Sequence, residues 1–166
     1  SIEHLTRLLV STSSREAELR RELANAPKDV RAAREIGFRA DAEAAESYDA
    51  LKAAGLFARF RRNGTWQCPT LVQLWKFPHL NDPGFLNDER LKYIPAPVRA
   101  GWRSFSSGPL AELLPYTKRS FTKQVELVGA MHAAHVPLLA GTDAGWGNPY
   151  TFAGFSLHDE LALFVQ

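Results

Sequence analysis

The chain has 166 residues, of which 45% are hydrophobic and 23% charged, a composition that suits one folded domain with a buried core. The formal net charge of +2 excludes a strongly basic chain, so we expect neither nucleic acid nor an anionic membrane as a partner. The single cysteine excludes an internal disulfide framework, and no apolar run approaches the roughly 18 residues of a membrane span. Because no signal-peptide pattern opens the chain, we expect a cytoplasmic location.

The first third of the chain is predicted to be helical after a short strand end. The opening letters, SIEH, are typical of the last residues of a strand. Ser13 and Glu16 have the spacing of a capping box, which predicts a helix to about Ala24. Asp41 is the expected N-cap of a longer helix that ends near Arg62. The predicted apolar face of that helix consists of Ala44, Tyr48, Leu51, Ala54 and Ala58.

Two buried strands are predicted on either side of a helix in the rest of the chain. The letters WQCPTLVQL predict a strand over residues 66–74, in which Cys68 is expected to be a buried small hydrophobic residue. A helix is predicted over residues 116–134, followed by a short strand over 136–141. Strand, helix and strand in this order, with both strands apolar, are typical of a parallel sheet.

A long connection and a last helix complete the predicted organisation. Residues 76–112 are rich in aromatic residues and contain prolines that should prevent long helices. This stretch is expected to lie on the side of the sheet that carries Asp143, where strands lead into loops. Ser156 and Asp159 have capping-box spacing before the last helix.

Asp143 is the most conspicuous candidate functional residue, because the letters PLLAGTDAGWG take an apolar strand directly into an acid. A carboxylate at the end of a buried strand is costly unless it is paired or binds a ligand. His4 also follows a strand end, and imidazole with carboxylate suits zinc, iron or manganese. Gly145 and Gly147 would allow a sharp turn beside a substrate. A helix-capping or turn aspartate explains the same pattern.

The motifs SIEH, CPTLV and AAHVPLLAGTDAG, followed by GFSLHDEL, occur in an order that resembles the metal-dependent amidohydrolase superfamily. The resemblance is greatest to the branch of imidazolonepropionase-like enzymes and metal-dependent prolidases. It implies an α/β fold, a partial (β/α)8 TIM barrel. Residues 1–166 would form the C-terminal part of the barrel domain, with strands six to eight and a long helical and loop excursion. His135 stands where that family has a glycine.

The resemblance also implies a chemistry for the strand ends. His4 falls on a metal ligand of the sixth strand, and Asp143 falls on the eighth-strand aspartate that binds metal and shuttles the proton of the attacking water. The implied cofactor is a divalent metal, zinc in the first place, with one or two ions in the intact enzyme. The implied reaction is hydrolysis of a carbon–nitrogen bond in an amide, a cyclic amide or a dipeptide-like small molecule.

The remaining ligands of that family do not occur in these 166 residues, which suggests a portion of a longer enzyme. We therefore expect the chain by itself to hold an ion weakly, not to be a competent hydrolase, and to self-associate through open strand edges. His158, Trp146 and Tyr150 are candidate substrate-binding residues near the mouth of the barrel, with surface exposure or ordinary loop packing as the alternatives.

Two other functions remain open at this point. The His158-Asp159 pair is similar to the metal-binding pair of HD-type phosphohydrolases, although such domains are helical and need further histidines. A non-catalytic binding module on a barrel scaffold is the second alternative.

Overall fold

A computed structural model describes residues 1–107, 112–145 and 147–166 of the chain. The described part is mostly helical and contains one two-stranded parallel sheet. The helices of the first half are α1 (Leu8–Ser11), α2 (Glu16–Ala24), α3 (Val30–Glu46) and α4 (Ala50–Arg62). The later helices are α5 (Leu71–Lys76), η1 (Phe77–His79), α6 (Pro83–Leu86), η2 (Glu89–Tyr93), α7 (Ala96–Ser107), α8 (Leu114–Ala133) and α9 (Phe155–Phe164).

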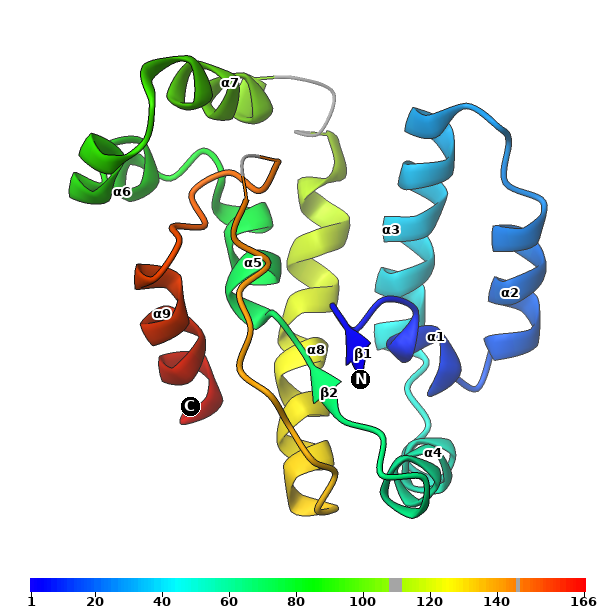
Figure 1. The fold of residues 1–166 in the computed structure, drawn as a ribbon. Helices are drawn as coiled ribbons and strands as arrows, with labels where there is room; N and C mark the ends of the chain where they lie inside the picture. Colours follow the sequence, from blue (N-terminus) through cyan, green and yellow to red (C-terminus); the bar gives the residue numbers. More distant parts are fainter. Residues whose placement is uncertain (108–111, 146) are drawn as a thin grey trace.

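The long helices α3 and α8 lie side by side in the middle of the molecule (Figure 1). Helix α2 flanks α3 on the outside, and α5 and α9 pack together on the other side of α8. The larger core lies among α1, α3, α4 and α8 and includes Leu9, Phe57 and Met131. Burial of such apolar side chains, each about 2 kcal/mol, holds these helices together.

The sheet consists of β1 (Ile2–Glu3) and β2 (Gln67–Cys68), which run parallel. Leu138 adds a third parallel segment, because the N–H of Gln67 donates to Pro137 O (2.9 Å) and the N–H of Leu139 donates to Gln67 O (2.8 Å). The predicted parallel pairing of the segments that contain residues 67 and 138 is therefore confirmed at this bridge.

The predicted partial (β/α)8 barrel of strands six to eight is wrong, because the extended segments are far too short. Residues 66–74 keep strand geometry only at Gln67 and Cys68, and α5 begins at Leu71. Thr70 has a left-handed backbone with φ of 51°, which ends the extended conformation directly after Pro69. Residues 136–141 contribute an isolated bridge rather than a strand.

The predicted helix from Asp41 to Arg62 is also wrong, since two helices cover this stretch. The carboxylate of Asp29 caps α3 by accepting from the N–H of Ala32, and Asp49 caps α4 by accepting from two N–H groups. Asp41 lies within α3, one turn before its end. Leu51, assigned to the apolar face, is 86% exposed, and the buried side chains of α4 are instead Ala53, Phe57 and Phe60.

The positions of the other predicted helices agree with the structure, but both predicted capping boxes are wrong. The N-caps are Arg15 for α2 and Gly154 for α9, and neither helix has a side-chain cap. Helix α2 ends at Ala24 and α8 covers the predicted range 116–134 to within two residues. Residues 76–95 form mainly short helical turns, as expected. The prediction that prolines prevent long helices is wrong for α7, which extends over 12 residues because Pro97 lies in its first turn, where a missing N–H costs nothing. Among the described residues, no helix is both long and apolar enough to cross a membrane.

Candidate functional site

Three parallel segments end side by side, and each ends in a non-glycine residue with a left-handed backbone. His4 follows β1 with φ of 66°, Thr70 follows β2 with φ of 51°, and Asp143 follows the segment at Leu138 with φ of 50°. Such a conformation costs a non-glycine residue roughly 1–2 kcal/mol and is concentrated at functional sites. The loop that leads to α9 contains two further left-handed residues, Tyr150 with φ of 58° and Gly154 with φ of 79°.

The three side chains converge at these carboxyl ends. Nδ1 of His4 lies 3.2 Å from Oγ1 of Thr70 and 3.8 Å from Oδ2 of Asp143. The side chains of His4 and Asp143 are 41% and 40% exposed, so both remain open to a ligand. The structure therefore brings together the two residues that the sequence predicts as metal ligands.

Asn148 holds Asp143 in place from the following loop. Its Nδ2 donates to Oδ2 of Asp143 (2.8 Å) and to the backbone carbonyl of the same residue (2.6 Å). Gln73 of α5 in turn donates from Nε2 to Oδ1 of Asn148 (3.4 Å). This chain of amides orients the carboxylate and leaves its Oδ1 free to accept a further hydrogen bond within the described structure.

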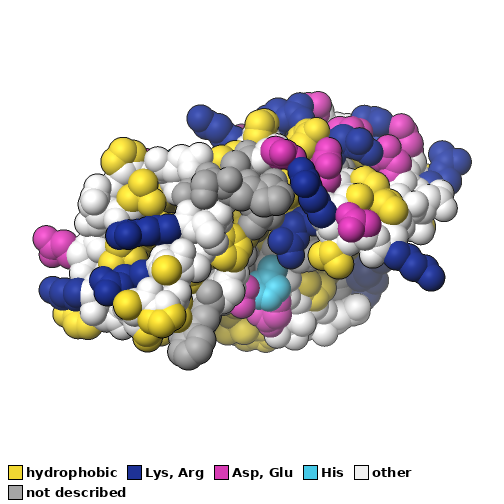
Figure 2. Space-filling view, turned by 90° about the horizontal axis from the view of Figure 1, so that it is seen from above, with side chains coloured by type: hydrophobic (Ala, Val, Ile, Leu, Met, Phe, Trp, Pro, Cys, Tyr) yellow, Lys and Arg dark blue, Asp and Glu magenta, His cyan; other side chains and the backbone are white. Residues whose placement is uncertain are grey.

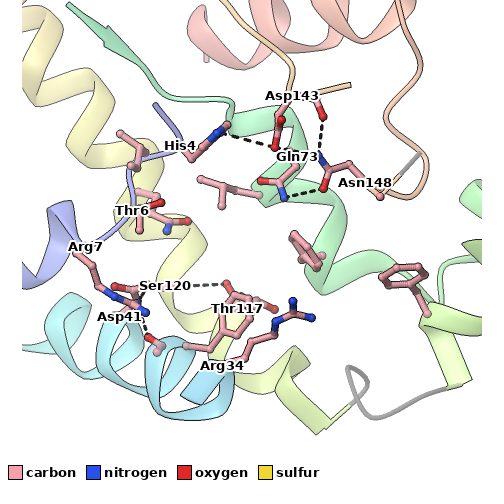
Figure 3. A pocket seen from close by; sticks show the side chains of 18 residues that line it. His4, Thr6, Arg7, Arg34, Asp41, Gln73, Thr117, Ser120, Asp143 and Asn148 are labelled. Atoms are coloured by element: carbon pink, nitrogen blue, oxygen red, sulfur yellow. Dashed lines mark hydrogen bonds and ion pairs between the residues drawn. The ribbon is translucent and has the colours of Figure 1, made fainter. Parts of the chain in front are cut away.

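His4 and Asp143 lie at one end of a pocket of about 500 Å³, the size of many small-molecule sites. Seen from above, a histidine lies in a hollow beside acidic side chains, with Lys and Arg side chains along the border (Figure 2). The other end is formed by the facing sides of α3 and α8, with Arg7, Asp41, Arg34, Thr117 and Ser120 (Figure 3).

Arg7 and Asp41 form a fixed ion pair in this second end of the pocket. Nη1 of Arg7 donates to Oδ2 of Asp41 and to the carbonyl of Gly37, both at 2.8 Å. A Cβ at Gly37 would lie 2.3 Å from Nη2 of Arg7, so glycine is needed for the guanidinium to reach this position. Burial raises the pKa of the Asp41 carboxyl to about 6, although the Arg7 charge opposes the shift.

The donor atoms fit one metal ion and not a two-metal centre. Metal bonds to imidazole nitrogen and carboxylate oxygen are about 2.0–2.2 Å long, so an ion fits between Nδ1 of His4 and Oδ2 of Asp143, which are 3.8 Å apart. The described residues contain no group of three or more His, Cys, Asp or Glu side chains that could hold an ion. An ion held by this pair would need Thr70, water or substrate at its other coordination positions.

Two of the predicted substrate-binding residues, Tyr150 and His158, do not line this pocket. Tyr150 is 1% exposed and packs between Phe85 and Trp102 in an aromatic core. His158 lies exposed on α9, and the neighbouring Asp159 is paired with Arg90 at 2.8 Å. Trp146 lies outside the described residues. The predicted position of the 76–112 stretch is confirmed for Phe77 and Phe105, which line the pocket together with Asp143.

Sequence reasoning missed Thr70, Asn148, Arg7 and Asp41 as residues of the pocket. Thr70 directly follows CP in the CPTLV motif, and this position after a strand was the available signal. Arg7 and Asp41 are 34 residues apart, and no local pattern connects them. Cys68 is 8% exposed, as predicted, and burial raises the pKa of its thiol to about 11, which keeps it protonated.

No family model matches this chain, and comparison with curated proteins and with solved structures finds no significant similarity.

Proposed function

We propose that this chain acts in metal-dependent hydrolysis of carbon–nitrogen bonds in small amides, with His4 and Asp143 binding one divalent ion, zinc in the first place. The observation that carries the proposal is the convergence of His4, Thr70 and Asp143 at three parallel carboxyl ends, each in a left-handed conformation. The resemblance of the motifs around His4 and Asp143 to those of amidohydrolases supports amides as substrates.

The side chains have distinct roles in this proposal. A divalent ion bound by the pair would lower the pKa of a water molecule and polarise the substrate carbonyl. Asp143, through its unpartnered Oδ1, accepts the proton of the attacking water and passes it to the leaving nitrogen. Asn148 fixes the carboxylate for this transfer, and the Thr70 hydroxyl fixes the imidazole of His4.

The number of protein ligands available to the metal ion determines how this function can be tested. Catalytic zinc sites generally use three protein ligands, so the chain alone is expected to lack turnover even at saturating metal. Imidazole in solution can supply a third ligand. We expect hydrolysis of small amides to appear only with zinc, cobalt or manganese and imidazole together, and to disappear in Asp143→Asn. If metal binds at the pair and no amide is turned over under any of these conditions, the hydrolytic function is wrong.

A binding module is the second candidate, because the pocket of about 500 Å³ is large enough for a small molecule. Binding of a small molecule that is unchanged in Asp143→Asn, together with no turnover, would favour it. The HD-type alternative has less support, since Asp159 is already engaged by Arg90 and by Lys76, at 3.8 Å from its Nζ.

A further inference from the structure

The end of the pocket that faces away from His4 and Asp143 contains polar groups that the proposed hydrolysis does not use. Helix α3 contributes Arg34, Gly37 and Asp41, which are three and four residues apart and therefore share one face. Helix α8 presents Thr117, Ser120 and Gln124 with the same spacing. Two packed helices thus direct matching polar faces into one cavity (Figure 3).

Two of these groups have no partner. Arg34 makes no ion pair or hydrogen bond with any described residue, although its helix neighbours Arg31 and Arg39 are both paired. Gln124 is only 6% exposed, and its amide forms no hydrogen bond within the described part of the chain. Gln124 lines the pocket, and its amide is not among the fully enclosed side-chain groups, so it is accessible to a ligand in the cavity.

The charges at this end favour an anion. Formally, Arg7 and Arg34 balance Asp41 and Asp143 among the residues that line the pocket. Asp143, however, lies at the other end, and Asp41 is bound by Arg7 through Oδ2 while its Oδ1 is enclosed. The guanidinium groups of Arg7 and Arg34 therefore face a single carboxyl, that of Asp41, whose charge Arg7 partly balances. Nε and Nη2 of Arg7 remain available as donors.

We propose that this end of the pocket is a carboxylate-binding subsite, in which Arg34, Arg7 and Gln124 bind a carboxylate of the substrate and select for amides that bear one. Arginine suits this role because its planar fork matches the two oxygens of a carboxylate. The hydroxyls of Thr117 and Ser120 donate to helix carbonyls and so offer lone pairs to a donor on the ligand. The inference rests on the proposed function for the reaction, but the binding itself requires no metal.

The test compares two ligands that differ only in charge, N-acetyl-leucine and N-acetyl-leucinamide, by calorimetry or NMR at low salt with EDTA present. We expect N-acetyl-leucine to bind at least about tenfold more tightly than N-acetyl-leucinamide. One charge-assisted hydrogen bond contributes about 1.4 kcal/mol, which corresponds to a tenfold difference in affinity. Arg34→Gln should reduce this preference to about threefold or less. Arg31→Gln is the matched control, because Arg31 lies one turn away on α3, pairs with Glu112, and does not line the pocket.

The same measurement on Asp143→Asn separates this inference from the proposed hydrolysis. The preference for the carboxylate should persist in that variant, even if all turnover is lost. The subsite is wrong if the wild-type chain binds both ligands equally, or if Arg31→Gln and Arg34→Gln reduce the preference to the same extent. Inorganic phosphate is the third ligand, and tighter binding of phosphate than of N-acetyl-leucine would overturn the assignment to a carboxylate.

Discussion

At the scale of single residues, the conformation of Asp143 is the most informative feature of the site. A left-handed backbone at an acid is unfavourable and is concentrated at positions where the placement of the side chain matters. Two hydrogen bonds from Asn148 stabilise this conformation. His135 is a comparable case at the end of α8, where its φ of 56° supplies the turn that a glycine usually provides.

Asp41 leads to a prediction about pH. Its pKa of about 6 in the folded chain, against an ordinary 3.8, means that the folded state holds this proton more tightly than the unfolded state. The contribution of Asp41 to the free energy of unfolding is therefore complete below about pH 4 and falls as the pH rises to about 6. The loss amounts to about 3 kcal/mol, at 1.4 kcal/mol per pKa unit.

Urea unfolding of the wild-type chain and of Asp41→Asn between pH 4 and 6.5 checks this prediction. The other carboxyl groups titrate in both proteins, so they cancel in the difference between the two free energies. The wild-type value should fall relative to the variant across this range. A difference that stays constant with pH would show that Asp41 titrates normally.

At the scale of elements, the first turn of α5 depends on a residue far away in the sequence. Thr70 gives α5 no side-chain cap. The buried carboxylate of Glu160 on α9 instead accepts from the N–H of Leu71 at 3.0 Å and from that of Val72 at 2.6 Å. Thr70, whose hydroxyl contacts the imidazole of His4, is therefore positioned in part by Glu160 of α9.

Replacement of Glu160 by alanine leaves two buried N–H groups without partners, so we expect a loss of about 2–4 kcal/mol in the free energy of unfolding. Glu160→Gln retains one acceptor oxygen and should lose about half as much. Glu35→Ala, an exposed acid on α3, is the control and should stay within about 0.5 kcal/mol of wild type in urea unfolding. Equal stability of Glu160→Ala and wild type would contradict the capping role.

The predictions for single elements succeeded where the signal was local and failed where a distant partner decides the outcome. Helical periodicity located α8, and the Ser13 pattern located the region in which α2 begins. Asp41 has the residue type of a cap, yet its real role depends on Arg7, 34 residues earlier. The cap of α5 comes from 89 residues away, which no pattern in the sequence indicates.

At the scale of the whole molecule, the sequence predicted the meeting of His4 and Asp143 but not the architecture around it. The order of apolar segments correctly indicated parallel pairing. It could not show that each segment leaves the extended conformation after two residues, because that depends on the left-handed turns at His4 and Thr70. Helices fill most of the described chain instead.

The short sheet exposes apolar side chains beside open strand edges, so we predict self-association. Trp66 and Leu139, at 47% and 43% exposure, adjoin the parallel segments. Unpaired backbone groups at such edges favour pairing with a second chain. Light scattering after size-exclusion chromatography should give a mass above that of a monomer, which Leu139→Lys lowers. Leu51→Lys on α4 is the control, and a monomer at every concentration would contradict the prediction.

The central claim, that His4 and Asp143 bind a divalent ion, is tested most directly by titration of the purified chain with zinc, followed by calorimetry. We predict one ion per chain, bound weakly and readily removed by EDTA. His4→Ala and Asp143→Asn should each weaken binding by at least about tenfold, whereas His158→Ala on α9 should leave it unchanged. No binding, binding that is unaffected in His4→Ala and Asp143→Asn, or tight binding of two ions would contradict this account of the site.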